Sequence, residues 1–61
     1  MNIRRRLMLI EAMNYAERRG YQYQMLWSPL KSQWYFEITG HMSHEKNRDL
    51  KAYLQRWEAN D

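Results

Sequence analysis

The sequence has few of the residues that interrupt regular structure or cross-link a small chain. It contains no cysteine, one proline and two glycines in 61 residues. Without cysteine, neither a disulfide nor a cysteine-based zinc site can stabilise the fold. Gly20 and Pro29 stand out as boundaries between long segments without breakers.

Long apolar runs are also absent. Arginines at positions 4–6 precede the apolar run 7–10, but Glu11 ends that run well short of the roughly seven or more residues of a signal peptide. No segment approaches the roughly 20 apolar residues of a membrane span. We therefore expect a cytoplasmic protein that does not have a membrane as its partner.

The length of the chain limits its core. Residues 1–61 are expected to form one domain, which buries only about 60% of the surface that its unfolded chain exposes. At this size the gain from apolar burial and the cost of ordering the chain nearly cancel. Because disulfides are excluded, oligomerisation is the remaining means of stabilisation unless the packing is unusually good. We therefore expect a homodimer.

Residues 21–40 alternate in polarity with a period of two on either side of Pro29, which is typical of half-buried strands. The large side chains that share one face are Tyr21, Tyr23, Met25 and Trp27 in the first run and Trp34, Phe36 and Ile38 in the second. Ser28 followed by Pro29 favours a type I turn between the runs. The segment is predicted to be an antiparallel hairpin with Trp27 and Trp34 near its closed end and with unpaired strand edges.

The segment from Asn2 to Arg19 is predicted to be a helix, because it is rich in strong helix formers and Gly20 follows it. One broad apolar arc contains Met8, Leu9, Ala12, Met13, Tyr15 and Ala16, and a stripe on the opposite side contains Ile3, Leu7 and Ile10. A helix with two apolar sides is usually buried on both. One side is expected to cover the hairpin, and the other to contact the second helix or a partner subunit.

Residues 43–60 are predicted to be a second helix, with Ser43 or Asn47 as its cap. Its apolar stripe at helical spacing consists of Leu50, Tyr53, Leu54 and Trp57. The predicted fold class is α+β in α-β-β-α order, a two-stranded antiparallel hairpin with two helices packed on one face. The side chains predicted to be buried together are Met13, Trp34, Phe36, Leu54 and Trp57.

The excess positive charge of +3 lies in the first helix. A concentrated basic patch is typical of nucleic-acid binding, because each neutralised phosphate releases counterions. The candidate phosphate-binding residues are Arg4, Arg5, Arg6, Arg18 and Arg19. The first three point in directions about 100° apart on a helix, so an ordinary solvated surface is the competing interpretation.

Catalytic and metal motifs are weak. His41 and His44 have the spacing of metal ligands, but a closed site needs about four ligands and Glu45 is the only acid nearby. Ser43 beside His44 gives poor geometry for a nucleophile and its base. We therefore predict no catalytic residue, no metal and no cofactor.

The apolar and aromatic residues that can lie on the surface are a stronger indication of function than the net charge of +3. We expect a small non-enzymatic interaction protein, a homodimer that binds a second, unidentified protein and regulates it, for instance as an inhibitor. The candidate partner-binding residues are Ile3, Leu7, Ile10, Leu26 and Tyr35. The alternative is a nucleic-acid-binding regulator that uses the arginines of the first helix.

Overall fold

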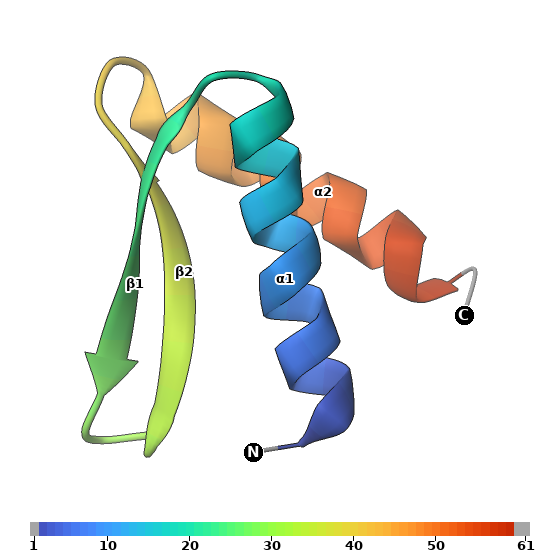
Figure 1. Cartoon of the computed structure of the whole chain (residues 1–61). Coiled ribbons are helices and arrows are strands. Elements are labelled where there is room, and N and C mark those ends of the chain that lie inside the picture. The colour runs from blue at the N-terminus through green and yellow to red at the C-terminus, as the bar shows by residue number, and fades with distance from the viewer. Residues whose placement is uncertain (1, 60–61) are drawn as a thin grey trace.

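The elements follow one another as helix, hairpin and helix. A computed structural model describes residues 2–59, in which α1 spans Ile3–Arg18, β1 Gln22–Ser28, β2 Gln33–Thr39 and α2 Ser43–Ala59 (Figure 1). The α+β class and the α-β-β-α order are confirmed. The predicted end of the second helix at residue 60 lies outside the described residues.

Local hydrogen bonds set both ends of α1. The Asn2 side chain accepts a hydrogen bond from the Arg4 backbone at 2.8 Å, so Asn2 is the cap and not the first helical residue. At the other end the Tyr21 N–H donates to the Ala16 carbonyl at 2.9 Å, and Gly20 has a φ of 70°. A left-handed glycine together with a hydrogen bond that spans five residues is a common way to end a helix, and here it turns the chain toward β1.

The hairpin pairs its two seven-residue strands in register, with Tyr23 opposite Ile38 and Trp27 opposite Trp34. The large side chains therefore share one face, as the alternation predicts. The Trp27 and Trp34 rings lie 5.5 Å apart at 65° near the closed end, and the Tyr23 and Phe36 rings lie 5.0 Å apart. Cross-strand pairs of this kind each contribute roughly 0.2–1 kcal/mol.

Asn47 joins α2 to the outer edge of β2. Its side-chain oxygen accepts a hydrogen bond from the Ile38 N–H at 2.9 Å, and its amide nitrogen donates to the Ile38 carbonyl at 2.8 Å. The same nitrogen donates to the Ser43 carbonyl at 2.8 Å. Asn47 therefore lies inside α2 and takes the place that a neighbouring strand would occupy at Ile38, which is a different role from the helix cap that the sequence suggested.

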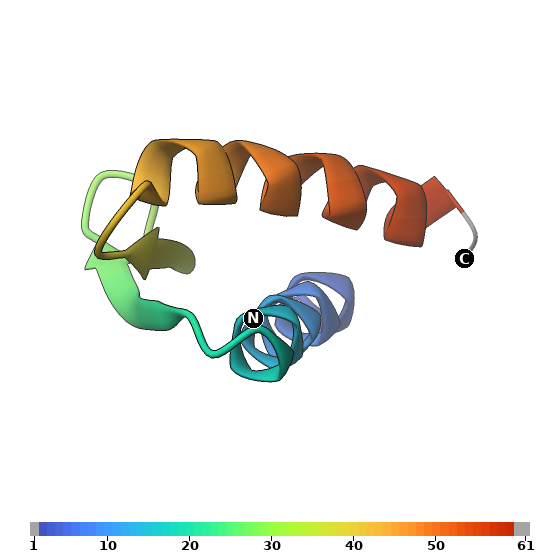
Figure 2. The ribbon, with the colours of Figure 1, turned by 90° about the horizontal axis from the view of Figure 1, so that it is seen from above.

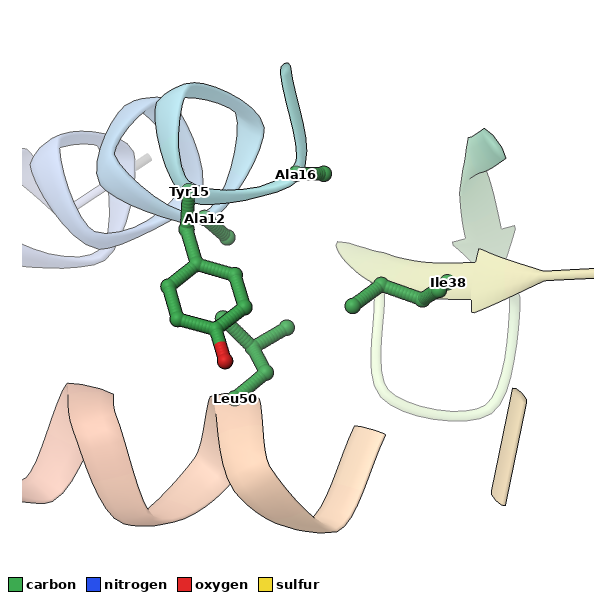
Figure 3. Packing of buried hydrophobic residues seen from close by; sticks show 5 residues of the cluster. All are labelled: Ala12, Tyr15, Ala16, Ile38 and Leu50. Atoms are coloured by element: carbon green, nitrogen blue, oxygen red, sulfur yellow. The ribbon is translucent and has the colours of Figure 1, made fainter. Parts of the chain in front are cut away.

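The core lies where the two helices meet the open end of the hairpin. Ala12, Tyr15 and Ala16 of α1 point toward Ile38 of β2 and Leu50 of α2 (Figure 3). Ile38 has no exposed surface. The two alanines let the backbone of α1 approach the hairpin closely, and Tyr15 packs on Tyr53 with ring centroids 4.9 Å apart.

The predicted core was wrong in its centre. Trp34 remains 41% exposed, because it lies toward the closed end of the hairpin, away from the cluster around Ile38. Phe36 and Leu54 are only partly buried at the margin of the cluster, and Met13 and Trp57 are half-buried outside it. The strand faces were correct, and the error concerns how far along the strands the core extends.

The molecule is thin. Its extents are 30 × 30 × 16 Å, and α2 runs across α1 instead of beside it (Figure 2). The radius of gyration, 11.6 Å, exceeds the about 10.5 Å of a compact chain of this length. The accessible surface is 4741 Å², against about 4300 Å² for a monomeric protein of this mass. The fold leaves more surface open than its size requires.

Candidate interaction surface

An apolar stripe of α1 lies on the side that neither the hairpin nor α2 covers. Ile3, Leu7 and Ile10 are 68%, 48% and 46% exposed. They follow one another at helical spacing, so they form one continuous strip along the helix. The sequence analysis expected this stripe to be covered by α2 or by a partner, and α2 does not cover it.

A shallow groove continues this stripe onto the hairpin. It has a volume of about 400 Å³ and is lined by Arg6, Leu9, Ile10, Met13, Met25 and Trp34. Ile10 belongs to both the stripe and the groove, so the two form one surface. We call this continuous set of residues, from Ile3 and Leu7 through the groove to Trp34, the apolar surface.

Leu26 and Tyr35 do not belong to the apolar surface. They are cross-strand partners on the opposite face of the hairpin, where Leu26 is half-buried and Tyr35 is exposed. Their neighbours on that face include Gln24 and Glu37, whose side chains are hydrogen-bonded to each other at 3.3 Å. The five candidate partner-binding residues therefore divide between two faces, with three on the apolar surface.

Among the candidate phosphate-binding arginines, Arg5, Arg18 and Arg19 make contacts with other described residues. Arg5 donates to the Trp34 carbonyl at 2.7 Å, and its Nε atom is buried without a hydrogen-bond acceptor among the described residues. The guanidinium of Arg19 lies 3.5 Å from the centre of the Tyr15 ring and donates to the Tyr15 carbonyl at 3.1 Å. Arg18 contacts the Glu11 carboxylate at 3.4 Å.

The arginines do not gather on one face. Arg6 lines the apolar groove, Arg5 reaches the outer edge of β2, and Arg4 lies near Glu58 of α2. Arg18 and Arg19 lie at the far end of the helix. The positive charge of α1 is therefore spread around the helix, and part of it holds the helix to its neighbours.

Two tyrosine hydroxyl groups donate to glutamates of α1. Tyr23 donates to Glu17 at 2.7 Å, and Tyr53 donates to Glu11. The hydrogen bond to Glu17 raises the pKa of Tyr23 above 10.0, and burial and the charge of Glu17 act in the same direction. The hydrogen bond to Glu11 likewise raises the pKa of Tyr53, with burial and the Glu11 charge adding to it and Arg18 opposing it.

Alkaline titration should show these two bonds. Because the pKa values of Tyr23 and Tyr53 are raised in the folded protein, the stability that the bonds supply is complete below pH 10.0 and is lost as the pH rises through the raised values. Ultraviolet absorbance of tyrosinate should show a late-titrating fraction that Tyr23→Phe and Tyr53→Phe each reduce. Glu17→Gln should return the pKa of Tyr23 toward 10.0. A late fraction unchanged in Tyr23→Phe would contradict the bond to Glu17.

Several exposed apolar side chains lie outside the predicted site. Trp27 adjoins Trp34 at the closed end of the hairpin, Leu30 at the turn is 95% exposed, and Met42 precedes α2. Trp27 was assigned to the covered face by the alternation, and only the limited length of the core leaves it open. Turn position alone marks Leu30 as exposed.

The described part of the chain offers no cluster for metal chemistry. His41 and His44 are both exposed, and within residues 2–59 no three histidine, aspartate or glutamate side chains lie together in a way that would hold a metal ion. Neither of the two described helices is long and apolar enough to cross a membrane.

Comparison of the chain with protein-family models, curated proteins and solved structures finds no match.

Proposed function

We propose that this protein is a small, non-enzymatic, cytoplasmic homodimer that binds a second protein through its apolar surface and regulates it. The observation that carries the proposal is the continuity of Ile3, Leu7 and Ile10 with the groove that ends at Trp34. Contiguous exposed apolar patches on small proteins typically mark interaction sites. Methionine and tryptophan, which are enriched at protein interfaces, line the same groove.

The open shape supports the same function. The protein exposes about 400 Å² more surface than its mass predicts, while only six side chains are buried within residues 2–59. Covering apolar area stabilises by roughly 25 cal/mol per Å². Binding a partner on the apolar surface would therefore add stability that this core is too small to supply alone.

The function is tested by changing the stripe without touching the groove. The variant Ile3→Gln with Leu7→Gln places polar, helix-compatible side chains at exposed positions, so folding should be retained. Tagged wild-type protein should retain a defined partner from a nuclease-treated extract of the cells that make this protein. The variant should retain at least tenfold less of that partner. Leu30→Gln is the matched control, because Leu30 is more exposed than either but lies outside the apolar surface.

Two outcomes would contradict protein binding. One is equal retention by the wild type and the stripe variant. The other is a complex that disappears on nuclease treatment, which would favour the nucleic-acid alternative. Fluorescence anisotropy with labelled duplex DNA would then show a slope of log K against log salt of about −0.9 for each phosphate contact. The intramolecular contacts of Arg5, Arg18 and Arg19 make this alternative the weaker one.

A further inference from the structure

The two edges of the hairpin differ in what covers them. On the outer edge of β2, Asn47 bonds both backbone groups of Ile38, and Arg5 bonds the Trp34 carbonyl. These groups point away from β1. In an antiparallel pair such outward positions alternate along both strands and lie opposite one another. The backbone groups of Tyr23, Met25 and Trp27, opposite Ile38, Phe36 and Trp34, therefore point outward on β1.

The outer edge of β1 carries none of the usual features that prevent strand pairing. Its sequence from Gln22 to Ser28 contains no charged residue and no proline. Within residues 2–59, no side chain and no segment other than β2 makes a hydrogen bond to its backbone. In Figure 1 it is the outermost strand of the molecule. The edge is long enough and regular enough to accept another strand.

The side of α1 next to this edge is self-complementary. Arg6, Ile10, Met13 and Glu17 recur at helical spacing on one side of α1. The first three line the groove together with Met25, and Glu17 accepts the Tyr23 hydroxyl, so the side faces β1. It has a positive end, an apolar centre and a negative end. Such a stripe matches a second copy of itself when the two helices run antiparallel about a two-fold axis.

We propose that a second copy of this chain binds here, with the two β1 strands paired antiparallel about a two-fold axis at Met25. This proposal rests on the homodimer of the proposed function and assigns its interface. The product is a four-stranded sheet with both α1 helices beneath it. Tyr23 of each copy lies opposite Trp27 of the other, and Arg6 of each copy lies near Glu17 of the other. The half-exposed Trp27 becomes covered.

The available area suits such a dimer. A specific interface buries about 800 Å² on each partner, which is about one sixth of the 4741 Å² surface of this protein. The β1 edge, Trp27 and the α1 side with Ile10 and Met13 would each contribute to this area. Ile3 and Leu7 lie farther around α1 and remain open to the regulated protein, which is why two binding events can use one apolar surface.

Charge reversal tests the arrangement. Arg6→Glu and Glu17→Arg should each raise the dimer dissociation constant about tenfold in sedimentation equilibrium, because each places like charges at two symmetric contacts. The double variant should return it to near the wild-type value. Tyr23→Phe is the control, because it removes the hydroxyl bond to Glu17 without changing charge, and its dissociation constant should stay within about twofold of the wild type. Failure of the double variant to recover would overturn the proposed interface.

The strand edge is tested by a single backbone methyl group. A chain this short can be synthesised with N-methyl Met25, which blocks one outward N–H and leaves the hairpin bonds of β1 to β2 in place. The synthetic protein should be monomeric, with the circular dichroism of the parent and with tryptophan fluorescence at longer wavelength. In mixed labelled samples of the parent, nuclear Overhauser effects should connect Trp27 of one copy to Tyr23 of the other.

The results distinguish this interface from the function on which it rests. A wild-type protein that sediments as a 7.7 kDa monomer at every concentration would overturn the dimer, as would a dimer that N-methyl Met25 does not weaken. Either result leaves the loss of partner in the Ile3 and Leu7 variant to be judged separately. Intermolecular nuclear Overhauser effects between Leu7 of one copy and Leu7 of the other, without effects between Trp27 and Tyr23, would place the second copy on the stripe. This result would also overturn the proposal.

Discussion

Replacing Asn47 with alanine should cost about 2–6 kcal/mol of the free energy of unfolding, because the N–H and carbonyl of Ile38 both lose their partner. Each partly buried backbone group left without a hydrogen bond costs about 1–3 kcal/mol. The whole domain is expected to have only about 3–9 kcal/mol of stability. Urea denaturation at one fixed protein concentration, followed by circular dichroism, should therefore show a large fall in the midpoint or a protein already partly unfolded in water.

Two further variants separate the hydrogen bonds from other effects. Asn47→Asp keeps an acceptor for the Ile38 N–H but cannot donate to the Ile38 or Ser43 carbonyl, so its loss should be intermediate. Asn14→Ala changes the same residue type at an exposed site on α1 and should shift stability by less than about 0.5 kcal/mol. Equal effects of Asn47→Ala and Asn14→Ala would show that Asn47 does not hold α2 to the hairpin.

Ile38→Ala should lower the free energy of unfolding by about 2–5 kcal/mol, because it opens a cavity between both helices and β2. Ile38→Val removes one methylene group and should cost about 0.5–1.5 kcal/mol. Thermal and urea unfolding of the two variants would measure how much free energy of unfolding each one loses. A cost of Ile38→Ala below about 1 kcal/mol would mean that the cluster around Ile38 is not the core.

Trp34→Ala is the matched comparison on the same strand face. Trp34 is larger than Ile38 but 41% exposed, so its truncation should cost less than Ile38→Ala. The substitution removes the ring contact with Trp27, but the backbone carbonyl of position 34 keeps the hydrogen bond from Arg5, which does not depend on the side chain. A larger loss of the free energy of unfolding in Trp34→Ala than in Ile38→Ala would support the core around Trp34 that the sequence predicted.

The repeating patterns in the sequence were sufficient to place the elements and their faces. Alternation around Pro29 predicts a hairpin whose large side chains share one face, and the spacing from Leu50 to Trp57 predicts the buried side of α2. These are local properties, because a strand repeats every two residues and a helix about every 3.6. Capping residues and the left-handed Gly20 then set the ends of α1 to within one residue.

The position of the core along the strands could not be predicted from the same patterns. Alternation marks a face but does not tell how far a helix extends beneath it, so Trp34 and Ile38 have the same pattern and opposite burial. Ala12 and Ala16 are fully buried because small side chains allow close approach, whereas a search for large apolar residues passes over them. Asn47 resembles a helix cap in sequence, and its bonds to Ile38 depend on how α2 folds back onto the hairpin.

The candidate site was predicted in part. The exposed stripe of Ile3, Leu7 and Ile10 follows from the helical period and lies where it was expected. Leu26 and Tyr35 lie on another face, since the register pairs them with each other away from α1. The contacts of Arg5 and Arg19 with Trp34 and Tyr15 depend on long flexible side chains, whose positions a residue pattern does not specify.

The protected edge of β2 limits how far the proposed sheet can grow. Once two β1 edges have paired, each remaining edge of the four-stranded sheet would be a β2 edge, on which Asn47 already bonds both backbone groups of Ile38 and Arg5 bonds the Trp34 carbonyl. A strand free on both sides would let copies add without end and form fibres, which is the usual hazard of exposed edges. In the proposed dimer these contacts would oppose the addition of further strands, so assembly would end at two copies.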